Sequence, residues 1–170
     1  AEQDLLVAEA KRRGIPIVVS YSRHWRPVVL RMAELVRGGL VGEIKTVITY
    51  PGGAALSFAS HATDLLCQFA GYQATEVYAR GKLPKGETPA GYEVEPQLDS
   101  VEVTFANGIV GVQLGVPGEH RGFYAEVFGT EGYARAGMYI PPYARDAKGV
   151  EIDLAARGLP ADASVFQVAY

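Results

Sequence analysis

The chain has few of the residues that build disulfide scaffolds or metal centres. Its 170 residues include one cysteine and three histidines. A single cysteine, Cys67, excludes an internal disulfide, and its apolar setting LLCQF is typical of a small buried hydrophobic residue. Three dispersed histidines and one cysteine do not form a zinc set, so we expect no metal site.

Long apolar runs and strongly basic stripes are also missing. No stretch approaches the roughly 18 consecutive apolar residues of a membrane span, and the N-terminal AEQDLLVAEAKRRG is too charged for a signal peptide. Residues 1–37 carry seven Lys or Arg against four Asp or Glu, without interleaved aromatic residues. We therefore expect a cytoplasmic protein with neither a nucleic acid partner nor a membrane partner.

A phosphate-binding glycine turn is absent from the sequence. No GxGxxG follows a strand-like run. The segment GKLPKGET has the glycine spacing of a P-loop, but Glu87 stands where the phosphate-binding lysine is needed, so we interpret the segment as a turn. We expect no cofactor to bind this chain tightly by itself.

The first part of the chain alternates helical and strand-like patterns. Residues 2–13 are helix formers followed by Gly14, and IPIVVSY (15–21) predicts a short strand buried in a parallel sheet. Apolar residues recur at helical spacing after Pro27 until Gly38, which predicts a second helix. EIKTVITY predicts another strand, and residues 54–70 predict a third helix that ends at Gly71.

The second part changes to strand patterns. Asn107-Gly108 separates two strand-like runs and predicts a tight hairpin, because both residues tolerate positive φ. GTEG (129–132) predicts another turn, and residues 141–160, rich in glycine, proline and charge, predict a surface loop. The strand-like runs are ATEVYARGKL (74–83), DSVEVTFAN (99–107), GIVGVQLGV (108–116) and FYAEVFGT (123–130).

Five motifs in order give the chain a family resemblance. They are IPIVVSYSRHWRP, RGGLVGEIKTV, a glycine pair leading to SHATDLL, VEVTFANGIVGV and YAEVFGTEGYARA. Together they resemble the Gfo/Idh/MocA family of oxidoreductases, named after glucose-fructose oxidoreductase, inositol dehydrogenase and rhizopine catabolism proteins. The resemblance runs from residue 1 to about residue 137.

The resemblance implies a domain plan. In that family a Rossmann domain binds NAD or NADP, and a C-terminal α+β domain lays an open, mostly antiparallel sheet against helices to complete the substrate site. By this resemblance, residues 1–21 would be the last helix and strand of a Rossmann domain, and residues 22–170 the domain for substrate binding and oligomerisation. We expect the chain to be a fragment, with NAD or NADP bound only by the complete protein.

The same resemblance singles out a histidine. Oxidation of a hydroxyl by hydride transfer requires a base, and imidazole suits that role near neutral pH. The family places such a histidine three residues before an aspartate and four after another; His61 and Asp64 match, whereas Ser57 replaces the first aspartate. The residues alone favour the plainer alternative, in which His61 is a helix-start histidine bonded to backbone and Asp64 is a solvated residue of the first turn.

Five further residues are candidates for binding, four of them with a plainer alternative. Tyr50 ends a strand next to Pro51, where the family has a longer loop, and we expect it to contact substrate. Arg23 and Trp25 follow the first strand and are expected beside the cofactor, or else in a domain-hinge salt bridge and in core packing. His120 and Arg121 are expected to bind substrate, or else to lie in a solvated loop.

Two functions follow from the resemblance. One is the substrate domain of an NAD(P)-dependent oxidoreductase that acts on a sugar, a polyol or a related hydroxy compound. The other is a non-catalytic, dinucleotide-sensing regulator, because LSFASHATDLL without the first aspartate is similar to the galactose-pathway repressor branch. We also expect homo-oligomers through the sheet, because its exposed Val, Phe and Tyr residues require cover.

Overall fold

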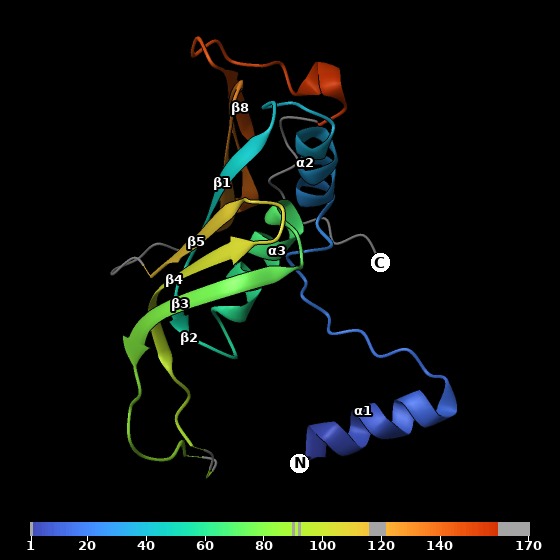
Figure 1. Cartoon of the computed structure of the whole chain (residues 1–170), viewed down its shortest axis with the longest axis vertical. Helices are drawn as coiled ribbons and strands as arrows, with labels where there is room; N and C mark the ends of the chain where they lie inside the picture. The colour runs from blue at the N-terminus through green and yellow to red at the C-terminus, as the bar shows by residue number, and fades with distance from the viewer. Residues whose placement is uncertain (1, 90, 92, 116–121, 160–170) are drawn as a thin grey trace.

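The computed structural model describes residues 2–89, 91, 93–115 and 122–159. Three α-helices and one short 3₁₀ helix accompany eight strands in the described ranges (Figure 1). The helices are α1 (Glu2–Arg13), α2 (Pro27–Arg37), α3 (Ser60–Ala70) and η1 (Ala155–Arg157). The strands are β1 (Ile44–Tyr50), β2 (Gly53–Ala54), β3 (Ala74–Lys82), β4 (Gln97–Phe105), β5 (Val110–Leu114), β6 (Phe123–Gly129), β7 (Gly132–Met138) and β8 (Tyr143–Asp146).

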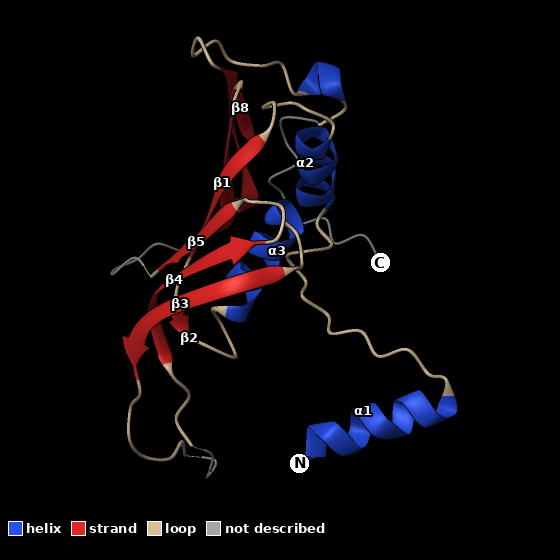
Figure 2. Cartoon of the chain, viewed as in Figure 1, coloured by secondary structure: helices blue, strands red, loops and turns tan. Residues whose placement is uncertain are grey.

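All eight strands belong to one open sheet. Its order is β2-β4-β5-β1-β6-β7-β8, and β3 pairs with β4. Among the described strands only β1 and β5 run parallel; the other pairs are antiparallel. The predicted fold class, an α+β domain with an open, mostly antiparallel sheet on helices, is confirmed (Figure 2).

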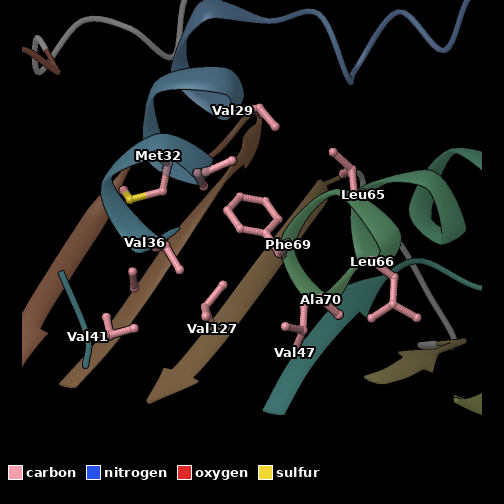
Figure 3. Close-up of a cluster of buried hydrophobic side chains, with 14 of the residues drawn as sticks. Val29, Met32, Val36, Val41, Val47, Leu65, Leu66, Phe69, Ala70 and Val127 are labelled. Atoms are coloured by element: carbon pink, nitrogen blue, oxygen red, sulfur yellow. The ribbon is translucent and has the colours of Figure 1, made fainter. Parts of the chain in front are cut away.

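The core lies between one face of the sheet and helices α2 and α3. In β6, Phe123, Ala125 and Val127 are buried, whereas Tyr124 and Glu126 are partly exposed, as the alternation of a strand requires. Figure 3 shows Phe69 of α3 beside Val127 and the side chains of α2. The opposite sheet face carries no helix in the described part of the chain (Figure 1).

Helix α2 and the two predicted turns match their sequence signals. Pro27 occupies the first turn of α2, and Val29, Met32 and Val36 point into the core. Gly108 has φ 82° in the hairpin between β4 and β5. GTEG connects the antiparallel strands β6 and β7. These signals are local, and the sheet satisfies each of them.

The prediction of a buried strand at residues 15–21 is wrong. Helix α1 forms as predicted but buries no residue, and it lies away from the sheet (Figure 1). Residues 15–20 have no regular secondary structure, and the exposed fractions are 55% for Ile15, 72% for Val18 and 66% for Val19. A parallel strand needs a neighbouring strand for its hydrogen bonds, and the described residues offer none to this segment.

Two other predictions need correction. The third helix begins at Ser60 rather than near Ala54, because Gly53 and Ala54 pair with β4 and residues 55–59 form a turn. Residues 141–160 are not all loop: β8 extends the sheet beside β7, and η1 follows. The period-two pattern of β8 spans only four residues, which is too short a signal to stand out among the glycines and prolines of residues 141–160.

Candidate functional site

His61 lies in the first turn of α3, at the end of the helix that faces residues 21–26. The helix is fixed against the sheet by Leu65, Leu66 and Phe69, whose side chains are buried. The imidazole is half-buried and meets the ring of Tyr21 edge-on, with ring centroids 5.4 Å apart. Packing of α3 therefore gives His61 a fixed position between residues 21–26 and the sheet.

Arg23 makes the polar contact to His61. Its Nη1 lies 2.8 Å from Nε2 of the imidazole. A guanidinium can only donate, so Nε2 accepts and the proton of a neutral ring resides on Nδ1. The guanidinium also lies 4.2 Å from the centroid of the Phe123 ring. His61 is thus bonded to a side chain, not to backbone as the plainer alternative proposed.

The surroundings of His61 favour its neutral form. Burial lowers the pKa of His61, and the charge of Arg23 lowers it further, while the carboxylate of Asp64 acts in the opposite direction. Nδ1 is buried and has no hydrogen-bond partner among the described residues. The arrangement holds an uncharged imidazole whose accepting nitrogen is Nε2.

Asp64 is paired with His24 rather than with His61. Nδ1 of His24 lies 3.0 Å from Oδ2 of Asp64, and both side chains are largely buried. Burial raises the pKa of Asp64, whereas the charge and hydrogen bond of His24 and the charge of His61 lower it. Arg23 therefore contacts His61, and the next residue, His24, contacts Asp64 on the same helix.

Ser57 does not meet His61. Its hydroxyl donates to Oε1 of Glu95, and the backbone N–H groups of Leu56 and Ser57 donate to Oε2 at 2.5 and 2.9 Å. These bonds lower the pKa of Glu95, the Ser57 hydroxyl contributing most. Ser57 anchors the loop before α3 instead of orienting the imidazole.

A buried amide holds the start of α3. Gln113, 1% exposed, donates from Nε2 to the carbonyl oxygens of Pro51 and Ala59 at 3.1 and 2.9 Å. Its Oε1 accepts a hydrogen bond of 2.7 Å from Thr63. Sequence reasoning missed Gln113, although strand alternation in VGVQL places it on the helix-covered face, where a polar side chain is unusual.

Tyr50 lies on the other face of the sheet. It stacks on Tyr124, with centroids 4.6 Å apart, and donates a 3.0 Å hydrogen bond to Glu126. Tyr124 alternates with Phe123, which contacts His61, so the two aromatic residues occupy opposite faces. Burial and the hydrogen bond to Glu126 raise the pKa of Tyr50 to about 12. The structure does not bring Tyr50 to His61.

The remaining candidates divide. Trp25 is 44% exposed, and its ring tilts against that of His24 with centroids 4.7 Å apart. It is therefore a surface residue beside His24 and not part of the core. His120 and Arg121 lie outside the described residues.

Within the described ranges, no group of three or more His, Cys, Asp or Glu is placed to hold a metal ion. No helix in those ranges is long and apolar enough to cross a membrane.

Among the described residues of the site, Arg23 has the chemistry to contact a dinucleotide phosphate. Nε of Arg23 is buried without a hydrogen-bond partner, and within the described residues no carboxylate forms an ion pair with this guanidinium. Such a group fits a phosphate oxygen. The glycine turn that cradles a pyrophosphate is not in the sequence, so NAD or NADP fits these residues in part only.

Comparison with known proteins gives structural neighbours alone. No family model and no curated protein matches the chain. An oxidoreductase from Sinorhizobium meliloti shares 18% identity, with a TM-score of 0.63 over 85% of this chain and 46% of its own. Levoglucosan dehydrogenase, solved with NADH and levoglucosan, shares 21%, with a TM-score of 0.61 over 78% and 44%.

A third neighbour is the WlbA dehydrogenase from Bordetella pertussis, solved with NADH and UDP-GlcNAcA. It shares 19% identity, with a TM-score of 0.59 over 77% of this chain and 43% of its own. The chain thus spans about half the length of the solved structures it matches. The chain shares its fold with part of these oxidoreductases, which are of the Gfo/Idh/MocA type.

Proposed function

We propose that the chain is the substrate domain of an NAD(P)-dependent oxidoreductase that acts on a hydroxyl group of a sugar, a polyol or a related compound. The observation that carries this proposal is the half-buried His61, held neutral with Nε2 as its acceptor, in a fold shared with dehydrogenases. A neutral imidazole is the form that can take a proton from a substrate hydroxyl.

The chemistry assigned to the chain is proton transfer. When bound to the complete protein, the nicotinamide would accept the hydride from the substrate carbon. The hydroxyl proton passes to Nε2 of His61, which requires the substrate oxygen to replace Arg23 as the partner of that nitrogen. Once displaced, the guanidinium is close enough to donate to the same oxygen and stabilise negative charge developing there.

Arg23 and Trp25 are proposed to face the cofactor side of this site. They follow the apolar residues 15–19, whose exposure supports a dock with a nucleotide-binding module of which residues 1–21 would be the last part. Asp64 then acts through His24 and through its charge on His61, without touching the reacting atoms. This assignment makes Asp64 a positioning residue.

A second candidate is the dinucleotide-sensing regulator. It is favoured by Ser57, which stands where the resemblance implies an aspartate and bonds to Glu95 instead, so no carboxylate among the described residues is hydrogen-bonded to the imidazole. A base without such a partner loses part of the orientation and charge stabilisation that catalysis gains from it. In this function His61 and Arg23 would read the bound dinucleotide rather than a reacting hydroxyl.

The two candidates differ in one assay. The complete protein that carries this chain is incubated with NAD or NADP and a panel of sugars and polyols, and reduction of the nicotinamide is followed by absorbance. Substrate-dependent reduction supports the oxidoreductase. Saturable binding of the dinucleotide without reduction by any member of a broad panel supports the regulator and contradicts the first proposal.

A further inference from the structure

Among the residues that the structure describes, strand β3 is an edge strand with no cover. There it pairs with β4 alone, and all nine of its residues are exposed, including Val77 at 64% and Tyr78 at 68%. Figure 1 shows β3 at one end of the sheet, beyond the reach of α2. An exposed edge presents unpaired N–H and C=O groups that can pair with another strand.

The hydrogen bonds of β4 show which groups of β3 point outward. Asp99 accepts from Gly115, and Phe105 donates to Ile109, so odd-numbered residues of β4 direct their backbone groups toward β5. Even-numbered residues of β4 therefore face β3, where Glu76, Tyr78 and Arg80 are opposite them. It follows that Val77 and Ala79 direct their N–H and C=O groups to the free edge.

We infer that β3 pairs with β3 of a second copy of this chain, antiparallel and centred on Tyr78. In this register Val77 lies opposite the partner's Ala79, so two outward-facing residues exchange both of their hydrogen bonds, twice across the two-fold axis. Tyr78 lies opposite the partner's Tyr78 in a non-hydrogen-bonded pair, where side chains approach closely. The two sheets become one continuous sheet.

Charge complementarity supports this partner and this register. The sequence ATEVYARGK places Glu76 opposite the partner's Arg80, and the two-fold axis repeats that pair. Within the described residues neither Glu76 nor Arg80 forms an ion pair. A strand that carried like charges at these positions would repel its own copy, whereas this one attracts it.

The inference does not depend on the proposed function, and it differs from packing through the open sheet face. The face that carries Tyr50 and Glu126 would bury side chains of the central strands. Pairing through β3 buries one edge only. A contact of this size is smaller than standard interfaces, so the dimer is expected to be weak.

Cysteine cross-linking tests the register. In a Cys67→Ala background, Tyr78→Cys puts two thiols on the two-fold axis, at a Cα separation of about 4.5 Å that suits a disulfide. Glu102→Cys is the matched control, because Glu102 is exposed and paired with Tyr78 on the neighbouring strand. We expect mild oxidation to yield a covalent dimer with Tyr78→Cys and far less with Glu102→Cys. Equal yields overturn the inference.

Charge reversal gives an independent test by sedimentation. Arg80→Glu places like charges opposite each other at two points and should weaken self-association at least about tenfold. The double variant Glu76→Arg with Arg80→Glu restores both pairs in reverse and should restore association. Circular dichroism of each variant establishes that the domain remains folded. Unchanged association with Arg80→Glu, or no recovery in the double variant, contradicts the edge pairing.

Discussion

Arg23 and His61, 38 residues apart in the sequence, are joined by a 2.8 Å hydrogen bond from the guanidinium to Nε2 of the imidazole. The bond fixes which ring nitrogen can accept a proton, and the adjacent charge opposes protonation of the ring. The neighbouring contact between His24 and Asp64 secures the same segment to the same helix.

The pKa of His61 depends on Arg23. Arg23→Gln keeps a donor but removes the positive charge, so the pKa of His61 should rise toward its ordinary value of 6.5. NMR titration of the imidazole signals measures this change. Arg31→Gln, which alters a guanidinium bonded to the carbonyl of Arg157, is the control and should leave the pKa of His61 unchanged. A fall in that pKa with Arg23→Gln would contradict the electrostatic account.

Stability should depend on pH through the same residue. Because the pKa of His61 is lowered in the folded chain, the unfolded chain binds more protons in the window below 6.5. This contribution is fully present above that value and is lost as the pH falls toward the folded pKa. Urea unfolding should therefore show a larger loss between about pH 7.5 and about pH 6 for the wild type than for His61→Asn.

Loss of His24 should expose the cost of burying Asp64. His24→Ala removes the hydrogen bond and charge that lower the pKa of Asp64, so that pKa should rise further. A hydrogen bond to a charged group contributes about 1.5–3 kcal/mol, and the free energy of unfolding should fall by a similar amount. His24→Gln retains a donor and should recover part of the loss. Equal stability of His24→Ala and the wild type would show that the pair contributes nothing.

Gln113 is predicted to be the most sensitive polar residue of the core. Gln113→Leu leaves the buried carbonyl oxygen of Pro51 without this donor, and an unsatisfied buried group costs about 1–3 kcal/mol. The Ala59 carbonyl and the Thr63 hydroxyl each lose one bond but remain bonded to each other. Thr63→Val removes one of the three bonds and should cost less. Denaturant unfolding measures the loss in free energy of unfolding for both variants. A loss for Thr63→Val as large as that for Gln113→Leu would contradict the network around Gln113.

Local signals account for what could be predicted from the sequence. The amphipathic spacing of α2 and the Asn107-Gly108 turn each involve neighbouring residues, and both predictions are confirmed. The apolar run 15–21 carries the pattern of a buried strand, but a strand also requires a partner, which a pattern cannot supply. The exposed Val18 and Val19 show the difference.

The sequence named residues of the candidate site but not their pairing. The structure brings together His61, Asp64 and Arg23, although the sequence placed Arg23 beside the cofactor and Ser57 beside the histidine, and it could not say that Asp64 would pair with His24. Such pairings depend on how α3 packs against a segment 40 residues earlier. The position of Tyr50, in contrast, could be predicted, because strand alternation in β1 places it on the sheet face opposite to that of the buried Thr49.

The isolated chain is predicted not to bind a dinucleotide tightly. Titration of the 170-residue chain with NADH and NADPH, followed by fluorescence, should show no saturation at micromolar concentrations, because the sequence has no phosphate-cradling glycine turn. Micromolar saturation would mean that Arg23 and its neighbours bind more of the cofactor than one phosphate contact explains.

The role of His61 as proton acceptor is tested most directly by the rate of hydride transfer in the complete protein. His61→Asn should lower kcat by about 10²-fold or more while the dissociation constant for NAD or NADP changes little, because general base catalysis contributes about 10²–10⁴-fold. Ser57→Ala, at a residue bonded to Glu95 and not to the imidazole, should leave kcat close to the wild-type value. An unchanged kcat with His61→Asn would contradict the account.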